Sequence, residues 1–365
     1  PLETAARISG LFMGLPLECA QCHDHPYESW TQRDFYGMAA FFAQVTPDRS
    51  ANQRMMRDIR KKREQGIRGA RPVVTIRESK VGDLTLDYGS GDEIIRPRFL
   101  GGRRLDASDD GIRRRVFAGM LKDPQYPYLS STIVNRIWAH FLGSGLVKPL
   151  DGLIPSNPAS HPRLLEWLAR DFVKSEYDLH HLIRTIANSG TYQRSSRSLA
   201  GAEPRTELFA VAKIRPLGME QTMFSLWRAT GIDRIQRRRN PAGFERLKTA
   251  GLYRFSYLFN DDESTEEERF QGTIPQALMM MNGGFSVNGS RAGPGTNLGI
   301  ILKGHKSYKD RLDWIFLTTL ARRPSEGEYA RFKYLDGRPG SAEVRAGYED
   351  LFWALLNTQE FISNH

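Results

Sequence analysis

The sequence predicts a mainly α-helical protein, an irregular arrangement of many helices with one small β insert. Apolar residues recur at helical spacing through the first 45 residues and through most segments after residue 107. Runs that alternate or are rich in β-branched residues are short and gather between residues 71 and 100. No internal repeat and no long low-complexity tract interrupts this pattern. We therefore expect three segments, residues 1–50, 51–106 and 107–365.

Residues 1–50 are expected to form helices around a cysteine motif. Residues 2–13 have the apolar spacing of a helix, which Gly14 and Pro16 end. A second helix begins after Thr31, a plausible N-cap with Asp34 at the third helical position. Its apolar stripe is expected to pack in the core or to line a cofactor pocket, and consists of Phe35, Met38, Ala39 and Phe42.

Residues 51–106 are predicted to be a basic linker followed by a small β connector. Residues 54–71 carry eight basic side chains against only Asp58 and Glu64, which predicts an exposed, loosely packed helix or linker. Contact with an anionic partner is the alternative interpretation of the same charge. Short strands are expected at residues 73–76 and 83–88, with glycines between and after them.

Residues 107–365 are predicted to be a helical domain. Ser131 is expected to cap one of its helices, with Ile133, Ile137, Trp138 and Phe141 facing inward. The expected helices are residues 111–122, 130–142, 164–174, 179–189, 215–230, 269–281, 308–321 and 341–357. Residues 252–259 alternate and predict a strand, and the acidic residues 261–268 lack the spacing of a calcium loop and predict a solvated turn.

Both cysteines of the chain lie in one short stretch, Cys19-Ala20-Gln21-Cys22-His23, followed by Asp24, His25 and Pro26. This is the C-x-x-C-H pattern of a c-type haem motif. Two thiols three residues apart can each form a thioether with one haem vinyl group, and the next residue places an imidazole under the iron. The expected cofactor is therefore covalent haem c, attached at Cys19 and Cys22, with His23 as the proximal ligand of the metal and His25 as a further candidate for cofactor binding.

Three other interpretations share the motif. A thioredoxin-like C-x-x-C requires a βαβ context, which the flanking residues lack. A disulfide at this spacing closes a very small loop and stabilises little. A zinc site could use Cys19, Cys22, His23 and His25, although ligands so close in sequence rarely complete a tetrahedron unaided.

Composition limits the class of protein. The 365 residues carry 52 basic and 42 acidic side chains, a net charge of +10, and the mean hydropathy of −0.49 indicates a water-soluble chain. No apolar run is long enough for a transmembrane segment. Pro1 is neither an initiator methionine nor the start of a signal peptide, so we expect a processed or trimmed piece of a longer protein. Covalent haem would place it in the periplasm or another extracytoplasmic compartment.

Several motifs resemble one protein family. Residues 12–15 running into Cys19–Pro26, then Trp30-Thr31-Gln32 and Asp34-Phe35-Tyr36-Gly37, resemble the second planctomycete cytochrome-c-like domain. The planctomycete-specific domain of unknown function that usually follows it is similar to Val134-Asn135-Arg136-Ile137-Trp138-Ala139-His140, Gly143, Gly145-Leu146-Val147, Ser160-His161-Pro162, Leu165, Trp167-Leu168-Ala169, Ser189-Gly190-Thr191-Tyr192, Thr273-Ile274-Pro275-Gln276-Ala277-Leu278 and Leu320-Ala321-Arg322-Arg323-Pro324.

The resemblance covers nearly the whole chain and implies an exported protein that carries haem. It does not supply a reaction, because the biochemical role of the family is largely unassigned. This chain departs from the family at Phe141, where a second histidine often follows His140, and it lacks the front half of the cytochrome-like domain.

Four polar residues of the downstream domain are further candidates for cofactor binding. Asn135, Arg136 and His140 share one predicted helix and either line a pocket beside the haem or form a buried hydrogen-bond network. His161 precedes Pro162 and is either a ligand or a helix-entry residue. We predict that the downstream domain covers the distal face of the haem, with His140 or His161 as ligand or hydrogen-bonding neighbour.

Two hypotheses for function follow. The first is a redox protein that transfers electrons or acts as a haem-dependent oxidoreductase, with a redox partner protein or an anionic polysaccharide as partner. The second is a structural or carbohydrate-binding surface protein in which the C-x-x-C-H site holds a metal. Nucleic acid is not an expected partner, because no recognised binding motif accompanies the basic charge.

Overall fold

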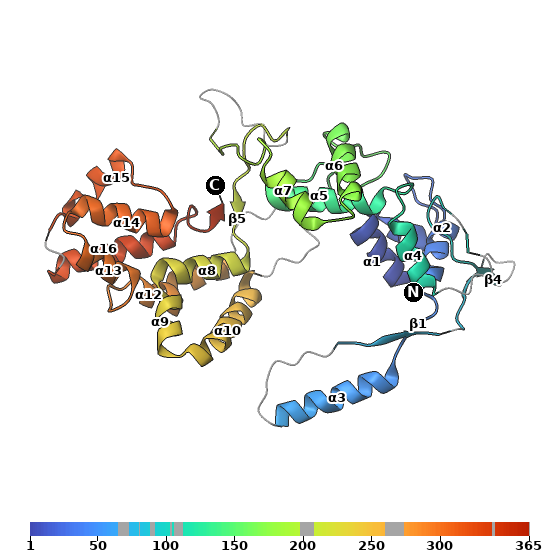
Figure 1. The fold of residues 1–365 in the computed structure, drawn as a ribbon, viewed down its shortest axis with the longest axis horizontal. Coiled ribbons are helices and arrows are strands. Elements are labelled where there is room, and N and C mark those ends of the chain that lie inside the picture. Colours follow the sequence, from blue (N-terminus) through green and yellow to red (C-terminus); the bar gives the residue numbers. More distant parts are fainter. Residues whose placement is uncertain are drawn as a thin grey trace. The chain divides into compact units, whose positions relative to one another are not determined.

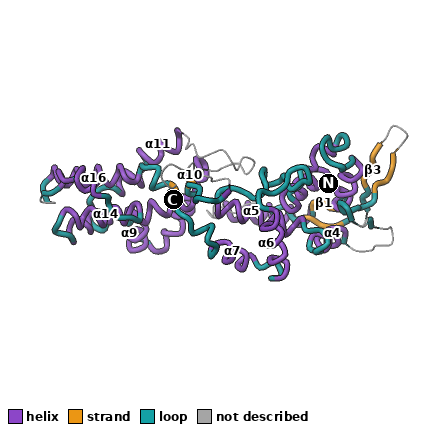
Figure 2. The backbone as a smooth tube through the Cα atoms, turned by 90° about the horizontal axis from the view of Figure 1, so that it is seen from above, coloured by secondary structure: helices purple, strands orange, loops and turns teal. Residues whose placement is uncertain are grey.

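The computed structural model describes residues 1–64, 73–79, 81–87, 92–102, 104–105, 112–197, 208–259, 274–337 and 340–364. The chain divides into two compact units, Pro1–Arg194 with Glu207–Ala210, and Ser195–Thr206 with Val211–His365. Helices predominate, and the strands are few and short (Figures 1 and 2). The mainly helical fold class is therefore confirmed, and the predicted boundaries at residues 50 and 106 stay predictions.

The N-terminal segment folds as predicted from its caps and apolar spacing. Its elements are α1 (Leu2–Ile8), the π-turn η1 (Ser9–Met13), the 3-10 turn η2 (Leu17–Gln21), α2 (Gln32–Ala39) and η3 (Ala40–Phe42). Thr31 and Asp34 form the predicted capping box, in which each side chain accepts from the other's backbone N–H. All four residues of the predicted stripe are buried in the core of this unit.

The insert holds two small antiparallel sheets and one helix. The strand pairs are β1 (Val45–Pro47) with β2 (Ile76–Glu78), and β3 (Leu84–Asp87) with β4 (Asp92–Ile95). The two predicted strands are thus present, the first shifted toward its C-terminal end. The basic segment is a regular helix, α3 (Arg49–Glu64), and residues 65–72 lie outside the described part of the chain.

The rest of the first unit contains α4 (Arg113–Leu121), α5 (Tyr128–Leu142), α6 (Pro162–Lys174) and α7 (Leu179–Ala187). The predicted Ser131 cap is wrong, because α5 begins at Tyr128 and Ser131 lies inside the helix. Trp138 of α5 is buried against α6 and α7, and Ile133, Ile137 and Phe141 pack at the edge of the same cluster. Their positions agree with the predicted inward face.

His180 and His181 are neighbours in helix α7, so their side chains cannot both face the same way. His180 is exposed, whereas His181 Nε2 lies 2.7 Å from an Asp171 carboxylate oxygen. Asp178 caps α7, and the His180 N–H that it accepts holds the pKa of Asp178 below its usual range. The pair is therefore part of the junction between α6 and α7.

The second unit is helical, with one short strand pair between β5 (Arg215–Pro216) and β6 (Ser363–Asn364). Its helices are α8 (Met219–Thr230), α9 (Ile232–Arg239), α10 (Pro241–Phe259), α11 (Ile274–Asn282), α12 (Gly284–Gly289), α13 (Asn297–Gly304), α14 (Tyr308–Leu320), α15 (Glu326–Arg331), η5 (Lys333–Leu335) and α16 (Ala342–Leu356). The predicted helices at 215–230, 269–281, 308–321 and 341–357 thus correspond to α8, α11, α14 and α16.

The predicted strand at residues 252–259 is wrong, because these residues continue helix α10. Phe244, Leu247, Leu252 and Phe255 recur at helical spacing and pack on the core of the second unit, so the longer period prevails over the local alternation. The acidic residues 261–268 lie outside the described residues.

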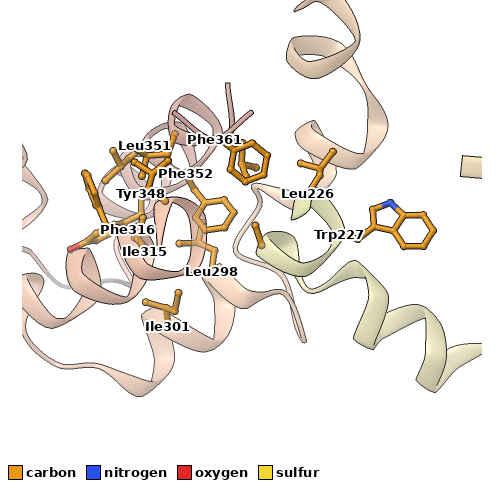
Figure 3. Packing of buried hydrophobic residues seen from close by; sticks show 14 of the residues in the cluster. Leu226, Trp227, Leu298, Ile301, Ile315, Phe316, Tyr348, Leu351, Phe352 and Phe361 are labelled. Atoms are coloured by element: carbon orange, nitrogen blue, oxygen red, sulfur yellow. The ribbon is translucent and has the colours of Figure 1, made fainter. Parts of the chain in front are cut away.

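The core of the second unit is built mainly from aromatic and branched side chains of α8, α13, α14 and α16, as Figure 3 shows. Arg311 of α14 is buried within it and donates to the backbone oxygens of His305 and Gly337 and to the Tyr348 hydroxyl. Because these three oxygens accept hydrogen bonds from the buried guanidinium, Arg311 holds the loops at His305 and Gly337 against the core. Among the described residues, no helix has the length and apolar character needed to cross a membrane.

Candidate functional site

The two cysteines lie on one exposed face of a tight turn. In the 3-10 turn η2, residues three apart share a face, so Leu17 and Ala20 point inward while Cys19 and Cys22 point outward. Leu17 and Ala20 have no exposed surface, whereas both cysteines are exposed free thiols. The apolar pair therefore fixes the turn to the core, and the thiols of Cys19 and of the C-cap residue Cys22 are left exposed to solvent.

His23 follows the turn with one ring nitrogen already engaged. Its Nδ1 lies 2.7 Å from the backbone oxygen of Asp24. A carbonyl oxygen can only accept, so Nδ1 carries the proton and donates it. The neutral imidazole then has its lone pair on Nε2, which is the tautomer that binds a metal through Nε2. The ring is exposed, so this lone pair is accessible.

His25 has the opposite arrangement, although it lies only two residues further on. Its Nδ1 accepts from the backbone N–H groups of Tyr27 and Glu28 at 3.3 and 3.1 Å. The ring proton of the neutral side chain is consequently on Nε2, which leaves no free lone pair for a metal. The ring also packs edge-on against Trp30. In this conformation His25 shapes the turn, and its predicted part in cofactor binding stays a prediction.

Asp24 and Gln32 join the motif to helix α2, a role that the sequence did not reveal. The Asp24 carboxylate accepts from the Gln32 backbone N–H at 2.8 Å, and the Gln32 side chain donates to the Gln21 oxygen at 3.0 Å. These bonds span eight and eleven residues. The two bonds fix the backbone on both sides of Cys22 and His23 to Gln32, the first residue of α2. The orientation of the His23 ring therefore depends on the position of α2.

Helix α5 and the loop before α6 contact the motif-bearing segment within the first unit. Arg136 of α5 donates to the Gly10 oxygen at 3.3 Å, and its buried Nε has no hydrogen-bond partner. The Leu153 N–H donates to the Gly14 oxygen at 2.8 Å, and Ser156 donates to the Glu28 carboxylate at 2.5 Å. Residues of the predicted third segment thus flank the segment that carries the cysteines.

Asn135 occupies a buried position with both amide atoms in use. Its Nδ2 donates to the Val147 oxygen and its Oδ1 accepts from the Val147 N–H, each at 3.0 Å. The side chain has no exposed surface. Of the two interpretations of Asn135, the structure shows the buried hydrogen-bond network. The two bonds fasten the loop after α5 to that helix.

The two candidate distal histidines lie at helix ends. His140 is exposed in the last turn of α5, and its ring contacts Phe141 edge-on. His161 is the residue before α6, where its Nδ1 lies 3.1 Å from the Ser160 hydroxyl and its ring packs against Phe209. In the described part of the chain, no three His, Cys, Asp or Glu residues gather as a metal site, so the distal ligand stays a prediction.

A separate cavity of about 710 Å³ lies between the start of α5, the proline-rich loop before α6, and α6. Its walls are mostly apolar, including Leu153, Ile154 and Leu165, and none of the cysteine-motif residues lines it. The cavity is therefore distinct from the exposed face that carries the thiols.

Comparison with known protein families gives two matches. Residues 1–47 match the model of PSCyt2, a protein of unknown function (DUF1549), and residues 113–242 match that of PSD1, a protein of unknown function (DUF1553). Neither curated proteins nor solved structures gave a match. The insert between residues 48 and 112 is covered by neither family model.

Proposed function

This chain carries the PSCyt2 and PSD1 pair, the planctomycete cytochrome-c-like segment and the domain that follows it, and we propose that it is an extracytoplasmic c-type haem protein. In this proposal, Cys19 and Cys22 hold haem c covalently and His23 is the proximal ligand. The protein then acts in electron transfer or in haem-dependent redox chemistry, with polysaccharide as one candidate substrate.

The proposal rests on two features found together, the exposed thiols of Cys19 and Cys22 and an imidazole of His23 whose Nε2 lone pair is free. Attachment requires two accessible thiols on the same side of one turn, and η2 presents them there. It also requires a histidine whose Nε2 lone pair is free, and the bond from His23 Nδ1 to the Asp24 oxygen leaves it so. The donor set of this segment therefore fits haem c.

When bound, haem supplies the one-electron chemistry. The residues of the chain fix its position and tune the iron. The Asp24 oxygen, by accepting from Nδ1, fixes the tautomer of His23 and keeps the ring in one orientation. The Asp24 carboxylate and Gln32 restrain the backbone that carries Cys22 and His23, so they act as positioning residues.

A metal site in a structural or carbohydrate-binding protein is the second candidate, and it receives less support. Zinc would need lone pairs from both histidines of the motif as well as both thiolates. The His25 Nδ1 is committed to two backbone N–H groups, and the part of the chain that is described holds no preassembled cluster of three or more ligands.

Intact mass spectrometry under denaturing conditions tests the proposal on protein exported by a host that attaches haem. We expect the mass of the chain plus one haem, and a visible spectrum of a c-type cytochrome. Cys19→Ala with Cys22→Ala should lose the covalent haem, whereas His25→Ala should retain it. An unmodified chain with stoichiometric zinc by elemental analysis would refute haem attachment and favour the second candidate.

The distal side separates an electron carrier from an enzyme. Carbon monoxide binding to the reduced protein indicates an open iron position, and its absence indicates two protein ligands. His140→Ala and His161→Ala, made singly, should change the spectrum or the carbon monoxide affinity in at least one case. If both variants match the unmodified protein, neither histidine approaches the iron and that part of the proposal fails.

A further inference from the structure

We infer that helix α3 and the returning residues 73–76, which lie between the two family matches, form a docking surface for an anionic lipid membrane. This inference is independent of the proposed haem function. Helix α3 can be followed in Figure 1 from the end of β1. Its described residues meet both requirements of an interfacial helix, a basic face and exposed apolar side chains beside it.

The helix is fixed in place at its start. The Asp48 carboxylate accepts from the Ala51 backbone N–H at 3.0 Å and from the Ser50 hydroxyl at 2.8 Å. The Ala51 bond in particular keeps the pKa of Asp48 below its usual range, so the cap is charged at neutral pH. Helix α3 then runs for 16 residues, about 24 Å.

The returning chain is held against one side of α3. Asn52 exchanges two hydrogen bonds with the Thr75 backbone, at 2.7 and 3.0 Å, and the Val73 N–H lies 3.2 Å from the Met55 sulfur. The Asp48 N–H also donates to the Thr75 oxygen at 2.8 Å, and the β1–β2 ladder continues the pairing beyond it. Residues 73–76 and α3 therefore form one surface.

Apolar side chains of α3 and of residues 73–76 are largely exposed in the described part of the chain. Met56 is 55% exposed, Val73 70%, Val74 65% and Ile76 44%. Met56 lies one helical turn from Asn52, which contacts Thr75, so the helix and the returning chain contribute to the same region. Four aliphatic side chains left in water on one small arm are typical of an interaction site.

Basic residues lie beside Met56 on the helix. Helix α3 carries seven basic and two acidic residues. Arg49 and Arg57 line a shallow groove together with Asn52, Gln53 and Met56. Of the two acids, Glu64 pairs with Arg60 at 3.1 Å. Helix α3 is therefore strongly basic, and two of its arginines lie beside the exposed Met56.

This combination favours a lipid surface over a soluble polyanion. A sulfated or carboxylated polymer would neutralise the cations but would leave the aliphatic side chains in water. Polysaccharide sites commonly use aromatic rings, and neither α3 nor residues 73–79 contain any. Anionic headgroups attract the arginines, and the acyl boundary receives methionine and valine side chains.

Vesicle co-sedimentation of the full chain tests the inference. One set of vesicles contains equal amounts of phosphatidylglycerol and phosphatidylcholine, the other phosphatidylcholine alone, and heparin serves as a soluble polyanion. We expect binding to the mixed vesicles, reduced by salt, and much weaker binding to phosphatidylcholine alone.

Two variants separate the contributions of charge and apolar contact. Arg49→Gln with Arg57→Gln should weaken vesicle binding roughly 30-fold, since each basic residue near such a surface contributes about five-fold. Met56→Ser with Val73→Ser and Val74→Ser should weaken vesicle binding about ten-fold and leave heparin affinity unchanged. All five side chains are exposed, so circular dichroism should remain that of the unmodified protein.

A matched control and a strengthening variant complete the design. Arg238→Gln with Arg239→Gln removes the same charge from exposed positions on α9 and should leave vesicle binding within two-fold, about 0.4 kcal/mol. Met56→Trp should bind mixed vesicles more tightly, because indole partitions into the membrane interface. The inference fails if mixed vesicles are not bound, if the α9 control weakens binding as much as the α3 variant, or if the apolar variant binds vesicles like the unmodified protein, which would indicate a soluble polyanion as the partner.

Discussion

Replacement of Asn135 by alanine should destabilise the first unit strongly while leaving any bound haem unchanged. Asn135 has no exposed surface, and its amide satisfies both the N–H and the oxygen of Val147 at 3.0 Å. Alanine can form neither bond. Water cannot replace the side chain without opening the packing around α5, so both Val147 groups lose their partners in a buried environment.

The magnitude follows from these two bonds. A buried backbone group left without a partner costs about 1–3 kcal/mol, so the pair costs about 2–6 kcal/mol in the free energy of unfolding. For a unit of this size, this corresponds to a melting temperature lower by about 5–15 °C. Thermal and urea unfolding, followed by circular dichroism, measure both quantities.

Asn157 offers a matched control in the loop before α6. Its Nδ2 donates to the oxygens of Lys148 and Gly152, each at 2.9 Å, but the side chain is only partly buried. Because water can reach these oxygens, Asn157→Ala should cost about 1 kcal/mol or less. The difference between the two asparagines therefore isolates burial.

Two results would refute this reasoning. Equal losses of stability in Asn135→Ala and Asn157→Ala would show that burial does not govern the cost. A shifted haem spectrum in Asn135→Ala at unchanged stability would instead make Asn135 a cofactor-binding residue, the other interpretation of its position in the sequence.

Three further predictions concern other parts of the structure. Arg322 lowers the pKa of Glu328 to about 2 from 4.5, so the ion pair stabilises the second unit above about pH 4.5 and this stabilisation is lost as the pH falls toward 2. Because the pair is partly exposed to solvent, Glu328→Gln should cost only about 1–2 kcal/mol in the free energy of unfolding at neutral pH. The variant should also remove this acid dependence from urea unfolding measured at several pH values. Gly14→Ala should cost about 2–4 kcal/mol, because Gly14 has a φ of 65° and a Cβ there would overlap Leu153; a melting temperature equal to that of the unmodified chain would show that the turn relaxes freely. His25→Ala should cost about 1–2 kcal/mol through the lost turn bonds and retain covalent haem in the intact mass, whereas loss of haem would make His25 a ligand.

The elements that could be predicted from the sequence depend on residues close together in the chain. The Thr31 and Asp34 capping box spans three residues, and the stripe on α2 repeats every helical turn, so both are visible in the order of amino acids. The same holds for the two cysteines and His23, whose spacing alone defines the motif.

Predictions failed where they were based on a few neighbouring residues and the structure depends on a longer stretch of the chain. Residues 252–259 alternate locally, yet they continue α10 because the helical period from Phe244 to Phe255 faces the core of the second unit. Ser131 has the side chain of a cap, but α5 begins three residues earlier at Tyr128. The basic residues 54–71 left a helix and a linker as alternatives, and the structure shows a helix over Arg49–Glu64, with Asp48 as its cap.

The sequence by itself determined the chemistry available at the site, namely two thiols and an imidazole at the spacing of haem attachment. The tertiary structure decided how those groups are presented. His23 and His25 are the same residue type two positions apart, but a backbone oxygen meets Nδ1 of the first and backbone N–H groups meet Nδ1 of the second. Which nitrogen keeps its lone pair therefore depends on the path of the backbone, which amino acid order alone does not specify.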